Sequence, residues 1–180
     1  MTENSAGPSG FVVEATRELD APPAFAWRSW TDPAVLRRWW GPTGFTCPTA
    51  DMDVRVGGTS LVSMSAPDWG FPEMFSTWEY THVQEPDRLE FVFRFVDADG
   101  HPLDDTGRPP GVPAEVAHTI TFEALLGNRT LMRVHEAGYV SGEPLEMSRQ
   151  GLEQSLDKLM PLFAGGECLV PSSVRSSENA

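Results

Sequence analysis

The sequence predicts an α+β fold in which an antiparallel sheet packs against one long C-terminal helix. Several segments between residues 46 and 137 alternate apolar and polar side chains at a period of two, which is typical of half-buried strands. From Ser141 the apolar period becomes helical. Two short helical segments also follow the first strand. Strands grouped in the middle of a chain, with helices set apart, favour α+β over a parallel α/β architecture.

The predicted domain covers residues 11–164. Residues 1–10 and 165–180 are mostly small and polar, so we expect two flexible ends. The first strand is predicted at Phe11–Leu19. Its apolar face consists of Phe11, Val13, Ala15 and Leu19.

Two short helices are predicted at residues 23–30 and 33–40. Asp32 is a typical N-cap before the second helix, and Gly41-Pro42 ends it, because proline cannot continue a helix. Each helix is too short to be stable alone in water, so its large side chains must pack on the rest of the chain. These side chains include Trp27, Trp30, Trp39 and Trp40.

The strand at residues 89–96 has the clearest alternation, and its apolar set faces a core. That set is Leu89, Phe91, Phe93 and Phe95. Residues 66–72 are predicted as a loop. Residues 97–114 are rich in Gly, Pro and Asp, so they form either a mobile lid or a plain insertion, and we favour the insertion. The remaining strands are predicted at 46–56, 59–65, 74–83, 116–125 and 130–137.

The long C-terminal helix begins near Ser141 and is expected to kink or end at Pro161. Its apolar stripe recurs at steps of three and four residues and should face the sheet. The stripe consists of Leu145, Leu152, Leu156, Leu159 and Phe163.

The net charge of −13 and the pI of about 4.6 argue against binding to nucleic acid or to anionic membranes. No apolar run approaches the roughly 20 residues that span a bilayer, and the N-terminus lacks the features of a signal peptide. A disulfide between Cys47 and Cys168 is one reading, but two reduced thiols in a cytoplasmic protein is the simpler one. The four histidines show no metal-ligand spacing, so we predict no metal and no cofactor.

One polar pair is predicted on the apolar face of the last two strands. If the apolar faces of the two strands lie on the same side of the sheet, the loop that joins the strands contains an odd number of residues. A loop at Leu126–Asn128 places His118 opposite Glu136, and a loop at Gly127–Arg129 places them on a diagonal. We favour a pair near the strand ends in which the two side chains satisfy each other's hydrogen bonds. The alternative is a centre for acid–base chemistry or for orienting a ligand.

The residues around the two short helices resemble the opening of the SRPBCC superfamily, which includes START and birch-pollen-allergen-like proteins. Within it, they are similar to the branch of homologues of the activator of the heat-shock-protein-90 ATPase. The resemblance covers about residues 11–163, and it is weaker at residues 53–58 and 86–89. The matching positions are Arg17, Ala21-Pro22, Trp27, Trp30-Thr31-Asp32-Pro33 and Trp39-Trp40-Gly41-Pro42.

This resemblance implies a helix-grip fold, in which a curved antiparallel sheet of six to seven strands surrounds the C-terminal helix. It also implies an apolar cavity between helix and sheet, and hence a stress-response type protein that binds a small, mostly hydrophobic molecule. One alternative is an enzyme of the polyketide cyclase, aromatase or dehydratase type, with His118 and Glu136 as acid and base. A co-chaperone that stimulates a chaperone ATPase ranks last, and a homodimer is also open.

The predicted ligand-binding residues lie on the concave face, on the C-terminal helix and around the second short helix. A dense group of tryptophans is most often core, but Trp39 and Trp40 are adjacent, so we expect one of them to line the cavity mouth. The full set is Trp39, Trp40, Phe45, Met64, Phe91, Phe93, His118, Ile120, Phe122, Met132, Val134, Glu136, Leu152 and Leu156.

Overall fold

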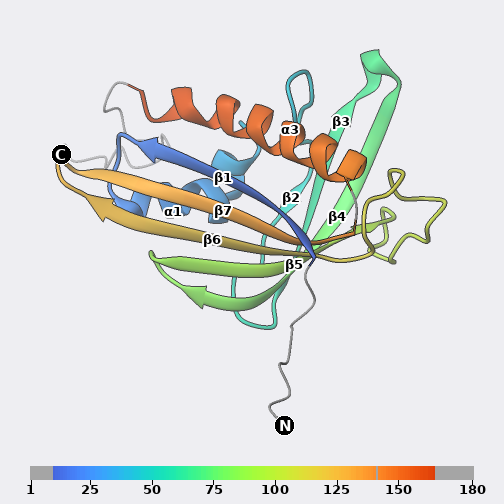
Figure 1. The fold of residues 1–180 in the computed structure, drawn as a ribbon, viewed down its shortest axis with the longest axis horizontal. Helices are drawn as coiled ribbons and strands as arrows, with labels where there is room; N and C mark the ends of the chain where they lie inside the picture. Colours follow the sequence, from blue (N-terminus) through green and yellow to red (C-terminus); the bar gives the residue numbers. More distant parts are fainter. Residues whose placement is uncertain (1–9, 141, 165–180) are drawn as a thin grey trace, which may run out of the picture.

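The computed structural model describes residues 10–140 and 142–164, and within them one antiparallel sheet curves around a long helix (Figure 1). The strand order is β1-β7-β6-β5-β4-β3-β2. This confirms the predicted α+β helix-grip architecture. The strands are β1 (Phe11–Leu19), β2 (Ala50–Asp51), β3 (Thr59–Ala66), β4 (Phe71–Gln84), β5 (Arg88–Val96), β6 (Val116–Leu125) and β7 (Arg129–Tyr139).

The long helix α3 (Gly142–Leu159) lies along the concave face of the sheet, with the two short helices at one end (Figure 1). The short helices are α1 (Pro23–Thr31) and α2 (Pro33–Leu36). Two single 3₁₀ turns complete the fold, η1 (Pro67–Trp69) and η2 (Met160–Leu162). The predicted flexible ends lie outside the described residues, except for Gly10.

Alternation along the strands separates the two faces of the sheet as the sequence predicts. Leu89, Phe91, Phe93 and Phe95 on β5 are all buried. On β1, Val13, Ala15 and Leu19 are buried, but Phe11 is exposed, because it lies at the start of the strand beyond a register shift.

The second short helix is shorter than predicted. Asp32 caps it as expected, since its carboxylate accepts the backbone N–H of Ala34 at 2.9 Å. However, α2 ends at Leu36, and the N–H groups of Trp39 and Trp40 both donate to the Leu36 carbonyl. Neighbouring side chains on a regular helix diverge by about 100°. The tightened turn lets both indoles enter the core, with exposed fractions of 0% and 7%.

The strand predicted at residues 46–56 is wrong for most of its length, since only β2 and an isolated bridge between Thr46 and Ser65 are present. Side chains of β3 replace much of the backbone ladder there. Ser63 Oγ accepts the N–H of Thr49, and Ser60 Oγ accepts the N–H of Asp53. The predicted loop at 66–72 is also shorter, because β4 already begins at Phe71.

Helix α3 is fixed at both its flanks by charged side chains. Arg17, on the face of β1 that looks toward α3, forms ion pairs with Glu153 and with Asp157, the latter at 3.1 Å. On the other flank, Lys158 Nζ donates to the carbonyls of Gly41 and Phe45, each at 2.8 Å. These contacts hold the apolar stripe of α3 on the sheet. The helix ends at Leu159, just before Pro161, which lies in η2; the predicted end of the helix near this proline is confirmed.

A cluster of tryptophans from α1, from the turn after α2 and from β4 fills one end of the concave face. The Trp30 ring lies 4.9 Å from Trp39, 6.1 Å from Trp40 and 6.2 Å from Trp78, between ring centroids. The Trp39 indole donates to the carbonyl of Ser29 at 2.9 Å. Aromatic pairs in such edge and tilted arrangements stabilise a core beyond the area that they bury.

No helix within residues 10–140 and 142–164 combines the length and the apolar character needed to cross a membrane.

We predict that Trp30→Ala lowers the free energy of unfolding by about 3–5 kcal/mol, because it leaves a cavity at the centre of the tryptophan cluster. Urea unfolding followed by circular dichroism measures the change. Trp69→Ala is the matched control, because Trp69 is 60% exposed. An equal loss in both variants would contradict the assignment of Trp30 to the core.

Candidate ligand-binding site

The hairpin between β6 and β7 places His118 directly opposite Glu136. Leu125 pairs with Arg129, so the loop is Leu126–Asn128, the first of the two predicted alternatives. Gly127 and Asn128 both have positive φ, 79° and 60°, which suits a short hairpin loop. His118 Nε2 lies 3.1 Å from Glu136 Oε1. The prediction that both side chains share one face is confirmed.

Tyr139 extends this pair into a network of three side chains. The β1–β7 register shifts between Phe11 and Val12, so the residues near Gly138 form an irregularity of the bulge type. A side chain at Gly138, which has φ of 124°, would meet the carbonyl oxygen of Glu115 at 2.8 Å. The shift turns Tyr139 inward, and its hydroxyl donates to Glu136 Oε2 at 3.0 Å.

Tyr139 is not among the site residues predicted from the sequence. Simple alternation from Glu136 would place residue 139 on the opposite face. Gly138 was the available signal, because a glycine near the end of a strand often marks a bulge.

All three network side chains are buried, with exposed fractions of 5% for His118, 6% for Glu136 and 4% for Tyr139. The imidazole stacks on the ring of Phe91, with 4.7 Å between centroids and 12° between planes. Burial raises the pKa of the Tyr139 phenol, the Glu136 charge raises it further, and the Ser148 hydroxyl on α3 acts in the opposite direction. The phenol therefore stays protonated at neutral pH and serves as a hydrogen-bond donor.

The segment at residues 97–114 packs on the same end of the sheet, beside the start of α3 (Figure 1). Leu103 and Val112 contact the hydrophobic core, and Gly111 lies so close to Pro144 that an added Cβ would be 2.2 Å from its Cγ. Arg108 fixes the segment internally by donating to the carbonyl of Leu103 at 2.7 Å. Apolar side chains from this segment and from α3 therefore surround the end of the sheet that carries the network.

The other predicted ligand-binding residues lie in several places. The ring of Phe93 is buried 5.6 Å from that of His118, and Leu152 is buried on α3. Phe45 and Met64 are partly buried beside Gly41, in the loop after α2. Trp39 belongs to the core by its burial and hydrogen bond. Trp40 Nε1 is buried and has no hydrogen-bond partner among the described residues. The remaining residues are buried on the concave face or on α3: Phe91, Ile120, Phe122, Met132, Val134 and Leu156.

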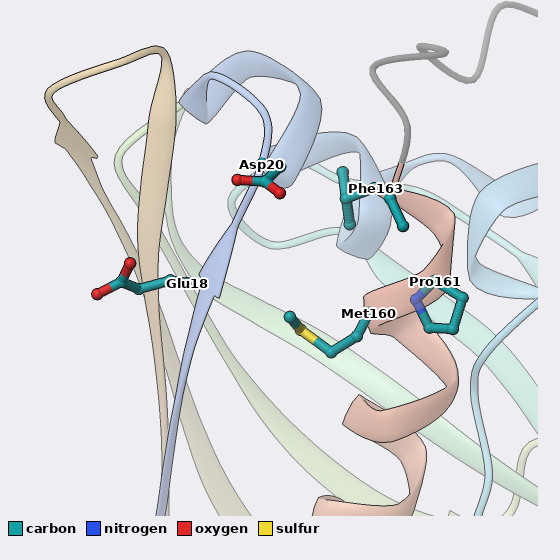
Figure 2. A pocket seen from close by; sticks show the side chains of 6 residues that line it. Glu18, Asp20, Met160, Pro161 and Phe163 are labelled. Atoms are coloured by element: carbon teal, nitrogen blue, oxygen red, sulfur yellow. The ribbon is translucent and has the colours of Figure 1, made fainter.

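A separate pocket of about 330 Å³ lies at the C-terminal end of α3 (Figure 2). Met160 points toward β1, whereas the carboxylate of Glu18 turns away from the helix and pairs with Arg129 at 2.6 Å. This pocket contains none of the predicted ligand-binding residues. Its lining consists of Glu18, Asp20, Met160, Pro161, Phe163 and Ala164.

Two other groups carry metal-binding or nucleophilic atoms. Asp97, Asp99 and His101 bring one ligand atom each within 4.8 Å of the others, but Asp97 Oδ1 already accepts the backbone N–H groups of Asp99 and His101. These bonds account for the turn without an ion. Cys47 is a buried free thiol whose pKa is raised to about 11 by burial, and Cys168 lies outside the described residues.

We predict that stability falls as pH rises from 10 toward 12, and that Tyr80 causes part of the loss. Burial raises the pKa of Tyr80 from 10.0 to about 12, so unfolding releases its proton in this window and alkaline conditions favour the unfolded chain. Wild type should lose about 1 kcal/mol more than Tyr80→Phe between pH 9 and pH 11. Urea unfolding at both pH values measures this difference, and equal losses would contradict the prediction.

Comparison with known families gives a match over most of the chain. The family model described as Activator of Hsp90 ATPase homolog 1-like protein matches residues 20–164. A search of curated proteins finds no match.

Solved structures with the same fold come from several bacteria. A protein from Chromobacterium violaceum is 28% identical, with 84% of this chain and 96% of that chain covered and a TM-score of 0.69. A Mycobacterium smegmatis protein is 25% identical, with coverage of 89% and 92% and a TM-score of 0.68. The AHSA1 protein of Silicibacter pomeroyi, at 22% identity, coverage of 86% and 98% and a TM-score of 0.69, supports the fold alone.

Proposed function

This chain belongs to the family of Activator of Hsp90 ATPase homolog 1-like proteins, within the SRPBCC superfamily, and from that premise we propose that it binds a small, mostly apolar ligand. The ligand lies between the sheet and the first turns of α3, beside His118, Glu136 and Tyr139. The fold is a ligand-binding fold in this superfamily, and the apolar character of the ligand follows from the side chains around the site.

The observation that carries this proposal is the buried polar network on an otherwise apolar face. Next to it, Ile120 pairs with Val134 and Phe122 pairs with Met132 on the same two strands. Taking polar and charged groups out of water costs free energy, and apolar residues of similar size often serve stability equally well. A few polar groups in an apolar surround are the usual composition of a small-molecule site.

The hydrogen bonds of the network favour ligand orientation over catalysis. His118 Nδ1 lies 3.2 Å from the carbonyl oxygen of Val116, and Nε2 contacts Glu136, so both ring nitrogens are engaged. A catalytic imidazole would have to give up one of these bonds to reach a substrate. Cyclase-type catalysis, chaperone stimulation, a homodimer and a cytoplasmic location stay predictions from the sequence.

We predict that Ser148→Phe abolishes binding of the neutral fluorescent probe N-phenyl-1-naphthylamine, because a phenyl ring would occupy the space between α3 and Tyr139. Gln150→Phe is the matched control, since Gln150 lies on the exposed side of the same helix. Probe fluorescence gives the affinity. Thermal unfolding gives the stabilisation by the ligand, which is about 2.7 kcal/mol at a concentration of 100 Kd.

The expected result is tight binding to wild type and to Gln150→Phe, and its loss in Ser148→Phe at unchanged circular dichroism. If both variants bind the probe as wild type does, the proposed position is wrong. If wild type shows neither fluorescence enhancement nor thermal stabilisation by any apolar probe, the proposed function fails. Native mass spectrometry of the purified protein tests independently for a small molecule that copurifies with it.

A further inference from the structure

The hydrogen atoms of the buried network can be counted from its geometry. The neighbour of His118 Nδ1 at 3.2 Å is the Val116 carbonyl oxygen, which only accepts, so any hydrogen on this nitrogen is directed at that oxygen. One further hydrogen lies between His118 Nε2 and Glu136 Oε1, whichever of the two atoms holds it. Tyr139 donates its hydroxyl hydrogen to Glu136 Oε2. In either protonation state, every hydrogen of these three groups is already shared within the network.

The positions that stay open are therefore lone pairs. Each carboxylate oxygen of Glu136 accepts one hydrogen bond in this network and has a further lone pair. The phenolic oxygen of Tyr139 is engaged by the Ser148 hydroxyl. A ligand that reaches the network meets acceptors. A carbonyl, ether or carboxylate oxygen placed there would direct its lone pairs at the lone pairs of the network and would leave buried polar groups without a hydrogen bond.

We propose that the ligand carries a hydrogen-bond donor, a hydroxyl or an amine, on an otherwise apolar body, and that Glu136 selects it by accepting that hydrogen. This inference rests on the proposed function and narrows its ligand class. It makes Glu136 the residue that determines specificity, with His118 as a positioning residue that holds its carboxylate.

Charges on the elements around the site agree with this selection. Arg17 and Lys158, which lie between α3 and its neighbours, are engaged by Glu153, Asp157 and the carbonyls of the loop after α2. The net charge of −13 also disfavours an anionic ligand.

The indole N–H of Trp40, which has no hydrogen-bond partner within residues 10–140 and 142–164, belongs to a different region of the concave face. Its ring is separated from His118 by Trp78 and Phe91, through consecutive ring contacts of 4.8, 4.5 and 4.7 Å. The N–H of Trp40 is therefore too remote to donate to a ligand group that lies at the network.

The test compares four ligands with the same chain length but different head groups: 1-decanol, decylamine, decyl methyl ether and decanoate. Isothermal titration and thermal unfolding give their affinities for the full-length protein. We expect decanol and decylamine to bind at least about 10-fold more tightly than the ether and the carboxylate, which corresponds to one buried hydrogen bond.

Two variants separate selection by Glu136 from a general preference for alcohols. Glu136→Gln keeps the size of the side chain but replaces one of the two acceptor oxygens by an NH2 donor, so the ratio of decanol to ether affinity should fall to about 3-fold or less. Tyr139→Phe removes the hydrogen that occupies Glu136 Oε2, so this ratio should stay at its wild-type value or rise. Circular dichroism checks that both variants fold.

Failure of this inference differs from failure of the proposed function. If wild type binds decyl methyl ether or decanoate as tightly as decanol, the donor requirement is overturned while ligand binding stands. If the ratio is the same in Glu136→Gln as in wild type, Glu136 is not the selecting residue and the inference falls. If none of the four ligands binds, the proposed function falls with it.

Discussion

The register of the β6–β7 hairpin is the constraint on which the structure around the site depends. Side chains alternate along a strand, so a shift by one residue would move every apolar side chain of one strand to the wrong face. A three-residue loop satisfies this constraint, because it pairs Ile120 with Val134 and His118 with Glu136. On its other edge β7 pairs with β1 in a register of its own, and β1 carries Arg17, which pairs with α3.

The end of β7 shows how one local irregularity completes the network. Regular alternation would send residue 139 to the outer face, but the bulge near Gly138 turns Tyr139 inward just before α3 begins. The close approach of Gly138 to the carbonyl of Glu115 leaves no room for a side chain there. Glycine at this position thus allows the bulge that brings the Tyr139 hydroxyl to Glu136.

Periodicity predicted the elements that bury a continuous apolar face, which here means β5, β6, β7 and α3. His118 and Glu136 could be predicted to lie together because that prediction needs only the alternation of side chains and an odd number of loop residues. The segment at 46–56 could not be predicted in the same way. There, the hydroxyls of Ser60 and Ser63 on β3 accept backbone N–H groups of the segment. These side-chain hydrogen bonds take the place of backbone hydrogen bonds between strands, and they leave no periodic pattern in the sequence. Tyr139 was missed because a bulge interrupts the period.

The tryptophan cluster and the polar network divide the concave face between two roles. Trp30, Trp39 and Trp78 are fully buried, and they fill one end of the concave face with rings that contact each other. At the other end, Phe91 stacks on His118, so the apolar floor continues up to the first polar group. Had packing alone shaped this face, an apolar pair like Ile120 and Val134 would fit at positions 118 and 136 as well. The ligand recognition that we propose gives these two polar residues a role that the stability of the fold does not require.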